Sequence, residues 1–491
     1  MGRGRRRERA PRRSRATRLP RGARRVGSLT ILVVCGAAAV APGTLFGGFA
    51  GSVDGQLRSR LHALGFTGRI DSTLETRLGR PIDRRQADLG RLLWFDTITG
   101  LNRDNTCAGC HSPTNGFGDT QSIAIGIGNN GVVGPDRTGP RNMRRAPMVL
   151  NNAFFPRLMW NSRFASLSDD PFDNSGGYAF PDPEGTTLSA EPHLLVAQAF
   201  IPPTERTEVA GFDFPGDNAA IRAEVMRRLN GVEAYRRLFG AIYPQVRRGS
   251  QIDYDMFARA IAEFEFTLSF ANAPIDRYAR GQPDALTTSE KRGALVFFGK
   301  GGCGACHAVS GNANEMFTDF REHSIAVPQL VPLQTNNQFD GTAANEDFGR
   351  SEVTQNEADR YAFRTPSLRN VAVEAAFMHD GAFTSLEAAI RHHLDAARSL
   401  LGYDPRTQGL PADLSGPIGP TGPLLAQLDR RLAKPTVLTE REFDDLVSFV
   451  KEGLLDPRAT PERLRRLVPK SVPSGRPALR FEFSGHVVRN R

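Results

Sequence analysis

Residues 107–111 read C-A-G-C-H, and residues 303–307 read C-G-A-C-H. Both stretches follow the pattern C-x-x-C-H, which is typical of the attachment of a c-type haem. In this pattern the two cysteines form thioethers with the haem, and the next histidine becomes the proximal ligand of the iron. A redox C-x-x-C or half of a zinc site requires no histidine directly after the second cysteine, yet here that histidine occurs twice. The sequence therefore predicts two covalently bound haems c.

Four of the five cysteines belong to these two stretches. Because all four are expected in thioethers, we expect no disulfide. The two histidines are the predicted proximal iron ligands. The complete set of predicted haem-binding residues is Cys107, Cys110, His111, Cys303, Cys306 and His307.

The net charge of +10 originates in the first residues of the chain. Residues 1–25 hold twelve arginines and one glutamate, so the remainder is close to neutral. An apolar stretch follows over 29–41, and this order is typical of an export signal. We expect a periplasmic protein, with residues 1–50 as a signal or, if uncleaved, with 29–49 as a membrane anchor. No basic face rich in aromatic residues occurs elsewhere, so nucleic-acid binding is not expected.

A similar segment precedes each haem stretch. Residues 89–95 read L-G-R-L-L-W-F, and residues 292–298 read R-G-A-L-V-F-F. We interpret each as a helix that runs into a haem loop, and the pair as a sign of two related haem domains. Further helices are expected from apolar periodicity, with Thr384 and Thr439 as N-caps. The periodic segments cover roughly 218–229, 253–270, 287–298, 385–398 and 439–454.

The predicted fold class is mainly α, with two cytochrome c-type haem domains and long connecting loops. Convincing alternating strands are absent from the sequence, and 49 glycines and 33 prolines indicate extensive loops. After the leader, we expect an N-terminal haem domain, a C-terminal haem domain and a Pro/Arg-rich tail without assigned function. Their predicted ranges are 51–275, with an insertion at 168–197, then 276–456 and 457–491.

Several other motifs accompany the haem stretches in a fixed order. They are R-A-P at 145–147, Trp160 with Arg163, Gln198-Ala199, F-R-T-P-S-L-R-N-V at 363–371 and M-H-D-G at 378–381. Together they resemble the bacterial di-haem cytochrome c peroxidases, which include the MauG-like enzymes, over most of residues 85–455. The resemblance implies a first, peroxidatic haem and a second, electron-transfer haem.

The resemblance also implies the residues of the peroxide pocket. In the family a glutamine, a proline four positions later and a glutamate ten positions after the glutamine line this pocket. Gln198, Pro202 and Glu208 keep that spacing. Glu208 is expected to shuttle a proton between the peroxide oxygens, and Gln198 to orient the peroxide. Glu205 is the competing carboxylate.

Trp160 matches the tryptophan that lies between the two haems in the family, so we expect it to assist electron transfer. In many relatives a histidine about sixteen residues after the first haem histidine blocks the peroxidatic iron. Ile127 stands there in this chain, and no histidine occurs between His111 and His193. The resemblance therefore implies a first iron that is open to peroxide, as in the MauG-like branch.

The sixth ligand of the second haem is expected to be His393. In the family this ligand stands fourteen positions after the histidine of H-D-G, which leads from His379 to His393. Helix periodicity agrees, because His393 shares an apolar face with Leu386, whereas the neighbouring histidine points about 100° away. Met378 is the alternative ligand.

Many members of the family also hold a calcium ion, in addition to the two haems. Many members hold it through an asparagine fifteen positions before the tryptophan, where this chain has Arg145. A guanidinium group cannot ligate a cation. Calcium is therefore doubtful, unless Asn142 substitutes.

The function that the resemblance implies is the reduction of hydrogen peroxide to water. The electrons would come from a small redox protein such as a monohaem cytochrome c or a cupredoxin. Two alternatives stay open. One is a MauG-like oxidase that acts on a protein or an organic molecule, and the other is a non-enzymatic di-haem electron-transfer protein.

Overall fold

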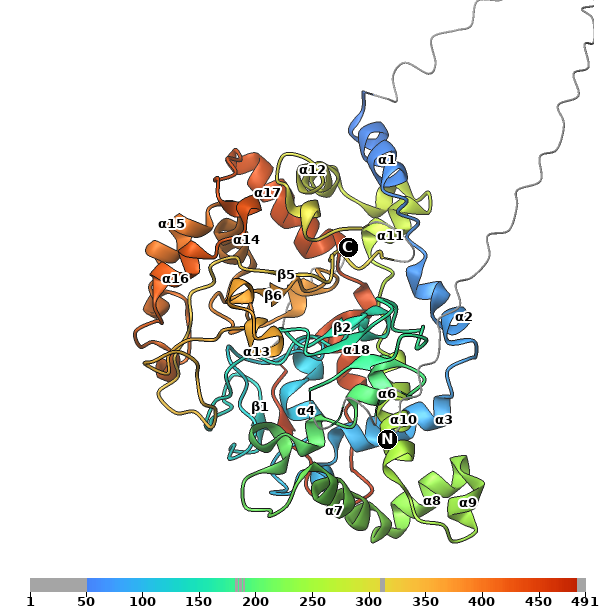
Figure 1. Cartoon of the computed structure of the whole chain (residues 1–491). Helices are drawn as coiled ribbons and strands as arrows, with labels where there is room; N and C mark the ends of the chain where they lie inside the picture. The colour runs from blue at the N-terminus through green and yellow to red at the C-terminus, as the bar shows by residue number, and fades with distance from the viewer. Residues whose placement is uncertain (1–50, 182–183, 185–187, 189, 310–313, 484–491) are drawn as a thin grey trace, which may run out of the picture. The chain divides into compact units, whose positions relative to one another are not determined.

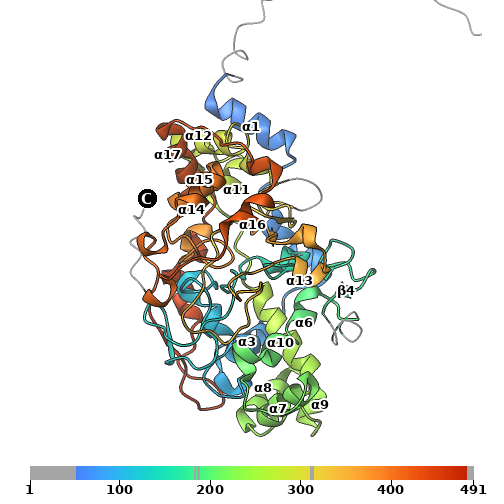
Figure 2. The ribbon, with the colours of Figure 1, turned by 60° about the vertical axis from the view of Figure 1, so that its left-hand side comes forward.

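Two crossed helix pairs organise the computed structural model of the chain (Figures 1 and 2). In the first pair, α3 (Arg84–Phe95) packs on α10 (Tyr254–Phe266). In the second, α12 (Thr288–Phe297) packs on α17 (Glu440–Ser448). The first helix of each pair is the predicted segment that leads into a haem stretch.

A glycine stands at each crossing point. A Cβ atom on Gly90 would lie 1.8 Å from the carbonyl oxygen of Ala260. A Cβ atom on Gly293 would lie 1.8 Å from the carbonyl oxygen of Asp445. Because no side chain fits at that separation, only glycine lets these backbones meet. The two crossings are therefore built in the same way.

The structure describes residues 51–483 apart from 182–183, 185–187, 189 and 310–313, and these residues belong to one compact unit. The leader and the predicted anchor at 29–49 lie outside the described residues. Within the described part of the chain, no helix combines the length and the apolar character needed to cross a membrane.

Long loops join the other α-helices of the described residues, and most of these helices are short. They are α1 (Val53–Ala63), α2 (Leu74–Leu78), α4 (Cys107–Cys110), α6 (Leu194–Gln198), α7 (Asn218–Asn230), α8 (Glu233–Ile242), α9 (Pro244–Arg247), α11 (Pro274–Ala279), α13 (Ser351–Thr354), α14 (Leu386–Leu394), α15 (Ala396–Leu401), α16 (Thr421–Ala426) and α18 (Pro461–Leu464).

The predicted helices are present, with two local differences. The segment predicted over 385–398 is broken at Asp395, which ends α14 and caps α15. The predicted cap Thr384 was wrong, because Ser385 accepts the hydrogen bond of the first turn. The hydroxyl of Thr384 instead donates to the carbonyl of Gln408. Thr439 caps α17 as predicted.

The strands are two or three residues long and form three small sheets. One sheet pairs β1 with β7 in parallel, another orders β2-β3-β4 antiparallel, and the third pairs β5 with β6 antiparallel. Their bounds are β1 Val132–Val133, β2 Arg157–Leu158, β3 Phe164–Ser166, β4 Tyr178–Ala179, β5 Glu322–His323, β6 Phe363–Arg364 and β7 Arg480–Phe481.

Two large apolar clusters surround the crossed helix pairs. The first contains residues of α3 and α10, and the second contains residues of α12 and the end of α17. Two segments pack into the cluster whose helices lie far from them in the sequence: helix α1 and the C-terminal tail. Helix α1 contributes Leu57 and Leu61 to the second cluster, whereas the tail contributes Leu464 and Val472 to the first. The division into two haem domains at residues 275–276 stays a prediction.

Replacing either crossing glycine by alanine should destabilise the protein, because a methyl group would meet a backbone oxygen. We expect Gly90→Ala and Gly293→Ala each to lower the free energy of unfolding by about 1–3 kcal/mol. Thermal denaturation of the purified protein measures the effect. Gly422→Ala is the matched control, because Gly422 lies in α16 with open space around its Cα. A loss no larger than that of the control would contradict the crossing argument.

Candidate active site

The first haem stretch forms one helical turn, α4, and ends at His111. The Nδ1 atom of His111 donates to the carbonyl oxygen of Pro147 over 3.0 Å. That hydrogen bond fixes the ring and leaves Nε2 available as a ligand. Cys107 and Cys110 form no disulfide, and burial raises the pKa of both thiols to about 12.

A cavity of about 300 Å³ adjoins this turn and contains the predicted catalytic residues. It is lined by Cys107, Cys110 and His111 as well as by Trp160, Gln198, Glu208 and Arg364. The structure thus brings predicted residues that lie more than 90 positions apart in the sequence, such as His111 and Glu208, around one cavity. The cysteines, an oriented histidine and an adjoining hollow are what covalent attachment of a haem requires.

Arg364 supplies an independent sign that an anionic group fits this cavity. Its side chain is buried, and its Nε atom donates to the carbonyl of Met159 over 3.0 Å. Burial lowers the pKa of Arg364 to about 10, and the negative charge of Glu322 offsets only part of this effect. No carboxylate of the described residues lies within ion-pair distance of the Arg364 guanidinium. A buried cation without a counter-ion is costly. The carboxylate groups of a haem would provide the missing charge.

Glu208 lies in a π-helical turn that spans Arg206–Ala210. Such turns are rare and often occur at functional sites. Desolvation, followed by the charge of Glu205, raises the pKa of Glu208 to about 7. Gly126 packs against this turn, since a Cβ atom there would lie 2.0 Å from the carbonyl oxygen of Thr207. The adjacent Ile127 is buried and donates its backbone N–H to the same carbonyl.

The competing carboxylate Glu205 is engaged elsewhere. Its Oε1 atom accepts from Arg163 over 2.9 Å. Among the described residues, no side chain or backbone group forms a hydrogen bond with the carboxyl of Glu208. Gln198 ends α6 and lines the cavity with Pro202. Of the two competing carboxylates, Glu208 is therefore the one that is free to exchange a proton.

Trp160 is buried and lines the cavity beside the first haem stretch. Its indole Nε1 donates to the carbonyl of Arg145 over 2.9 Å, and its own carbonyl accepts from the backbone of Arg364 over 2.7 Å. Two residues after Arg364, the backbone of Pro366 lies near His307 and acts to raise the pKa of that histidine. A short run of backbone thus joins Trp160 to the histidine of the second haem stretch.

The second haem stretch faces the predicted ligand on α14. The rings of His307 and His393 lie 6.2 Å apart between centroids. Imidazoles that share one metal ion through bonds of about 2 Å have ring centres separated by about 6 Å. The Nδ1 atom of His307 donates to Phe317 over 3.1 Å, and that of His393 to Ala389 over 2.8 Å. Each Nε2 atom is left for an iron.

The alternative ligands are placed differently. His392 is fully buried and uses both ring nitrogens, at 2.8 Å to the carbonyl of Ile325 and 3.0 Å to the hydroxyl of Ser399. Met378 packs against a separate apolar cluster that includes Leu330 and Leu414. The structure therefore favours His393 over Met378.

Two other histidines are held by neighbouring groups. His193 is buried, and its Nδ1 accepts from the backbone of Leu195 while its Nε2 lies 3.2 Å from the carbonyl of Ala153. His323 lies between two carboxylates, at 2.9 Å from Asp319 and 2.8 Å from Asp429. Both rings are thus engaged by groups of the protein.

Arg145 occupies the position where the family places a calcium ligand. Its guanidinium lies 2.5 Å from the carboxylate of Glu374 and donates to the carbonyl of Asp119 over 3.3 Å. Its backbone N–H donates to the carbonyl of His379. The arginine thus brings its own positive charge into a buried position. Asn142 lines the haem cavity instead.

Glu265 is a cavity residue that sequence reasoning missed. It lies on α10, is 3% exposed, and its Oε2 has no hydrogen-bond partner among the described residues. Burial alone raises the pKa of Glu265 to about 8. The available signal was the stretch A-I-A-E-F-E-F at 260–266, in which two glutamates stand among apolar residues.

The comparisons with known proteins agree with this geometry. A profile of the family described as di-haem cytochrome c peroxidase matches residues 84–284. The methylamine utilization protein MauG of Methylorubrum extorquens is 29% identical over 434 residues, covering 87% of this chain and 94% of MauG. The cytochrome c551 peroxidase of Pseudomonas aeruginosa is 26% identical over 315 residues, covering 64% of this chain and 72% of that protein.

Solved structures extend the likeness to the fold. A MauG-like protein associated with microbial copper homeostasis superposes with a TM-score of 0.54 at 24% identity. The match covers 77% of this chain and 91% of that protein. The mainly helical class predicted from the sequence is confirmed.

Glu265 generates a prediction about stability and pH. Its folded pKa of about 8 exceeds the ordinary value of 4.5, so its contribution to stability is lost as the pH rises from about 4.5 to about 8. We expect Glu265→Gln to raise the free energy of unfolding at pH 8–9 by on the order of 1 kcal/mol or more. Thermal denaturation of the two proteins at that pH measures the difference. The gain should vanish near pH 4.5.

Glu263→Gln is the matched control on the same helix. Glu263 is also buried, but its carboxylate pairs with Arg80 over 2.6 Å. That variant should lose stability at neutral pH rather than gain it. Equal behaviour of the two variants would contradict the assignment of Glu265 as an unpartnered acid.

Proposed function

We propose that this chain, which belongs to the di-haem cytochrome c peroxidase family, reduces hydrogen peroxide to water in the periplasm. The members of this family are oxidoreductases that carry two haems c. The electrons come from a small redox protein, a monohaem cytochrome c or a cupredoxin. Family membership favours an enzyme over the non-enzymatic electron-transfer alternative.

One observation carries this proposal. Glu208 and Gln198 share a cavity with His111 and the two cysteines of the first haem stretch. Ile127 occupies the position of the blocking histidine, and its apolar side chain is buried beside the Glu208 turn. The described residues of this cavity thus offer a proton-transfer group and no second histidine. We infer that the first site accepts peroxide without prior reduction of the second.

A haem held by Cys107, Cys110 and His111 would supply the iron at which peroxide is reduced. Glu208 accepts the proton of one peroxide oxygen and returns it to the other, because a pKa of about 7 lets the carboxyl group serve as base and then as acid. The Gln198 amide donates a hydrogen bond that orients the peroxide. Pro202 shapes the wall between them.

Electrons are proposed to enter at the second site and pass Trp160. The indole of Trp160 lines the first cavity. The Trp160 carbonyl accepts from the backbone of Arg364, and Pro366, two residues further on, lies near His307. The Nε1 hydrogen bond to Arg145 holds the ring in one orientation. Trp160 is therefore a positioned relay between the two sites.

His393 is proposed as the sixth ligand of the second iron. Its ring faces His307 at the separation that two ligands of one ion require, and burial lowers the pKa of both rings, which keeps them neutral. A histidine in place of the methionine ligand found in many relatives favours the ferric state. The second site should accordingly have a low reduction potential.

Calcium is not proposed for this chain. The Arg145 guanidinium, paired with Glu374, already supplies a positive charge at that position. The carboxylate of Glu374 and the carbonyl oxygen of Asp119 both contact this guanidinium.

A MauG-like oxidase is the second candidate function. The 29% identity with MauG over 87% of this chain favours it, as does the open first site. In this case the oxidising equivalents from peroxide would act on a protein or an organic molecule. Turnover of peroxide with reduced cytochrome c, compared with turnover in its absence, separates the two functions.

Glu208→Gln should lower kcat/KM for hydrogen peroxide by about 10²–10⁴-fold, because the amide cannot carry the proton. In the wild-type enzyme, kcat/KM should rise with pH through an apparent pKa near 7, as Glu208 becomes a base. The variant should lose this rise. Steady-state kinetics between pH 5 and 9 measure both effects.

Glu205→Gln is the informative companion variant. It removes the negative charge that raises the pKa of Glu208, so the pH profile should move toward acid while most turnover remains. A fall in turnover as large as that of Glu208→Gln would contradict the assignment of roles between the two carboxylates.

His393→Met should change the ligand of the second iron and raise its reduction potential, by a fraction of the roughly 0.8 V that axial ligands span. Spectroelectrochemical titration of the purified protein measures the potential, and the absorption spectrum reports the ligand. His392→Met is the neighbouring control, because His392 is bound to backbone and serine. An unchanged potential in His393→Met would reject His393 as a ligand.

A further inference from the structure

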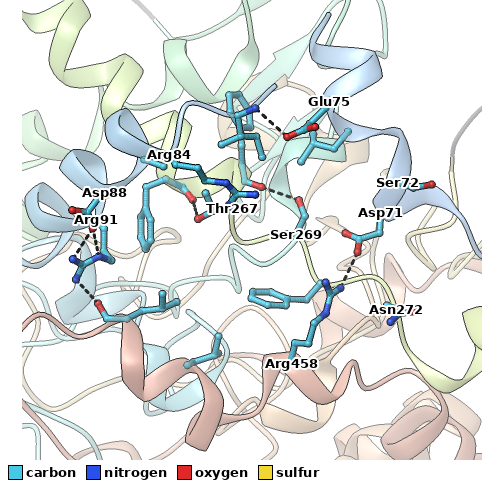
Figure 3. Close-up of a pocket in the computed structure, with 18 of the residues that line it drawn as sticks. Asp71, Ser72, Glu75, Arg84, Asp88, Arg91, Thr267, Ser269, Asn272 and Arg458 are labelled. Atoms are coloured by element: carbon cyan, nitrogen blue, oxygen red, sulfur yellow. Dashed lines mark hydrogen bonds and ion pairs between the residues drawn. The ribbon is translucent and has the colours of Figure 1, made fainter. Parts of the chain in front are cut away.

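A second hollow, of about 750 Å³, lies outside the haem cavity (Figure 3). One wall is the outer face of α3, another is formed by the end of α10, and a third is formed by residues 458–467 of the tail. We call it the arginine groove. Its volume is typical of sites for small organic ligands, and neither the predicted catalytic residues nor the haem ligands line it.

The charge of the groove is positive. Three carboxylates line it, those of Asp71, Glu75 and Asp88. Six arginines line it as well: Arg69, Arg84, Arg91, Arg280, Arg458 and Arg466. The excess therefore favours an anionic ligand.

Three of these arginines are free to bind such a ligand. Arg91 pairs with Asp88, Arg458 pairs with Asp71, and Arg280 donates to neighbouring oxygens. By contrast, the exposed side chains of Arg69, Arg84 and Arg466 form no hydrogen bond or ion pair with any described residue. Figure 3 shows Arg84 reaching from α3 into the groove toward Thr267 and Ser269. A guanidinium in this setting matches a carboxylate.

The floor of the groove is apolar and aromatic. On α3, Arg84, Ala87, Asp88 and Arg91 follow the i, i+3, i+4, i+7 spacing of one helix face. Beneath them lies Phe264, and other phenylalanines and leucines complete the floor. A ligand that combines a carboxylate with an aromatic ring would use both parts of the groove.

The floor adjoins the proximal side of the first haem stretch. The ring of Phe264 lies 5.6 Å from that of Trp94, and Trp94 lies 5.9 Å from His111, between centroids. The indole Nε1 also donates to the carbonyl of His111 over 3.4 Å. Phe264 lines the groove, whereas Trp94 lines the haem cavity. Two aromatic rings thus separate the groove from a predicted iron ligand.

We propose that the arginine groove binds a small phenolic carboxylate, and that this compound donates electrons to the first haem site through Trp94. The inference rests on the proposed peroxidase function and adds a second class of donor. It differs from the Trp160 route, because Trp94 lies on the His111 side and connects with the surface rather than with the second site.

The proposed reaction balances without a further reactant. Two phenols each lose one electron and one proton and become phenoxyl radicals. One hydrogen peroxide takes up the two electrons and the two protons, its O–O bond breaks, and two waters form. Trp94 carries one electron at a time, and the arginines that bind the carboxylate remain unchanged throughout.

Isothermal calorimetry of the holoprotein with 4-hydroxybenzoate tests binding. We expect one site per chain and an affinity about tenfold weaker in the Arg84→Ala/Arg466→Ala double variant. Arg85→Ala is the matched control, because Arg85 is an exposed arginine on the same helix that does not line the groove. The neutral analogue 4-hydroxybenzyl alcohol should bind more weakly than the acid. Absence of binding, or equal binding by the double variant or the alcohol, would overturn the proposed site.

Trp94→Phe tests the electron path. We expect this variant to bind 4-hydroxybenzoate normally but to lose about tenfold more of its phenol-supported peroxide turnover than of its cytochrome-supported turnover. Freeze-quenched electron paramagnetic resonance after peroxide addition should show a tryptophan radical that the variant lacks. Equal losses with both donors, or an unchanged radical signal, would overturn the path. If no donor supports turnover in the wild type, the peroxidase proposal fails, while calorimetry still decides the groove.

Discussion

Close contact between a glycine and a carbonyl oxygen on the facing helix is the constraint on which both haem stretches depend. At Gly90 and at Gly293 the absent side chain lets α3 meet α10 and α12 meet α17. The glycine-bearing helix then leads into the haem stretch, so the crossing sets where the cysteines and histidine emerge. In the first pair, α10 also carries Glu265 into the haem cavity and Phe264 into the arginine groove.

Periodicity was sufficient to predict α7, α10, α12 and α17, because their apolar faces extend over several turns. It did not predict α1 or α8, nor the helices of six residues or fewer outside 385–398. It was insufficient at local breaks. Asp395 interrupts the segment 385–398 because its side chain caps the following helix, α15. Ser385 replaces Thr384 as a cap because Thr384 is engaged by Gln408, which is remote in sequence. Such partners are set by tertiary contacts, and a single sequence does not reveal them.

The candidate active site also combines features that spacing in the sequence predicted with features that it did not. Spacing within a motif identified the haem stretches, and spacing from the H-D-G motif pointed to His393, whose ring faces His307 in the structure. What the sequence did not reveal are side chains that act through burial. Glu265 and His323 look ordinary in the sequence, and Arg364 stands out only as part of the 363–371 motif. In the structure neither Glu265 nor Arg364 forms an ion pair with a described residue, and His323 lies between two aspartates. Their environments arise only when distant segments meet.

The exchange of segments between the two apolar clusters bears on biogenesis. Residues 464–481 complete the first cluster, and β7 adds to β1 through the pairs Val132–Arg480 and Val133–Phe481. Ser474 also donates to the carboxylate of Asp96, directly after α3. During translation the region around the first haem stretch would stay incomplete until these late residues have been made. A nascent chain can therefore present C-A-G-C-H to the attachment machinery before the surrounding packing closes.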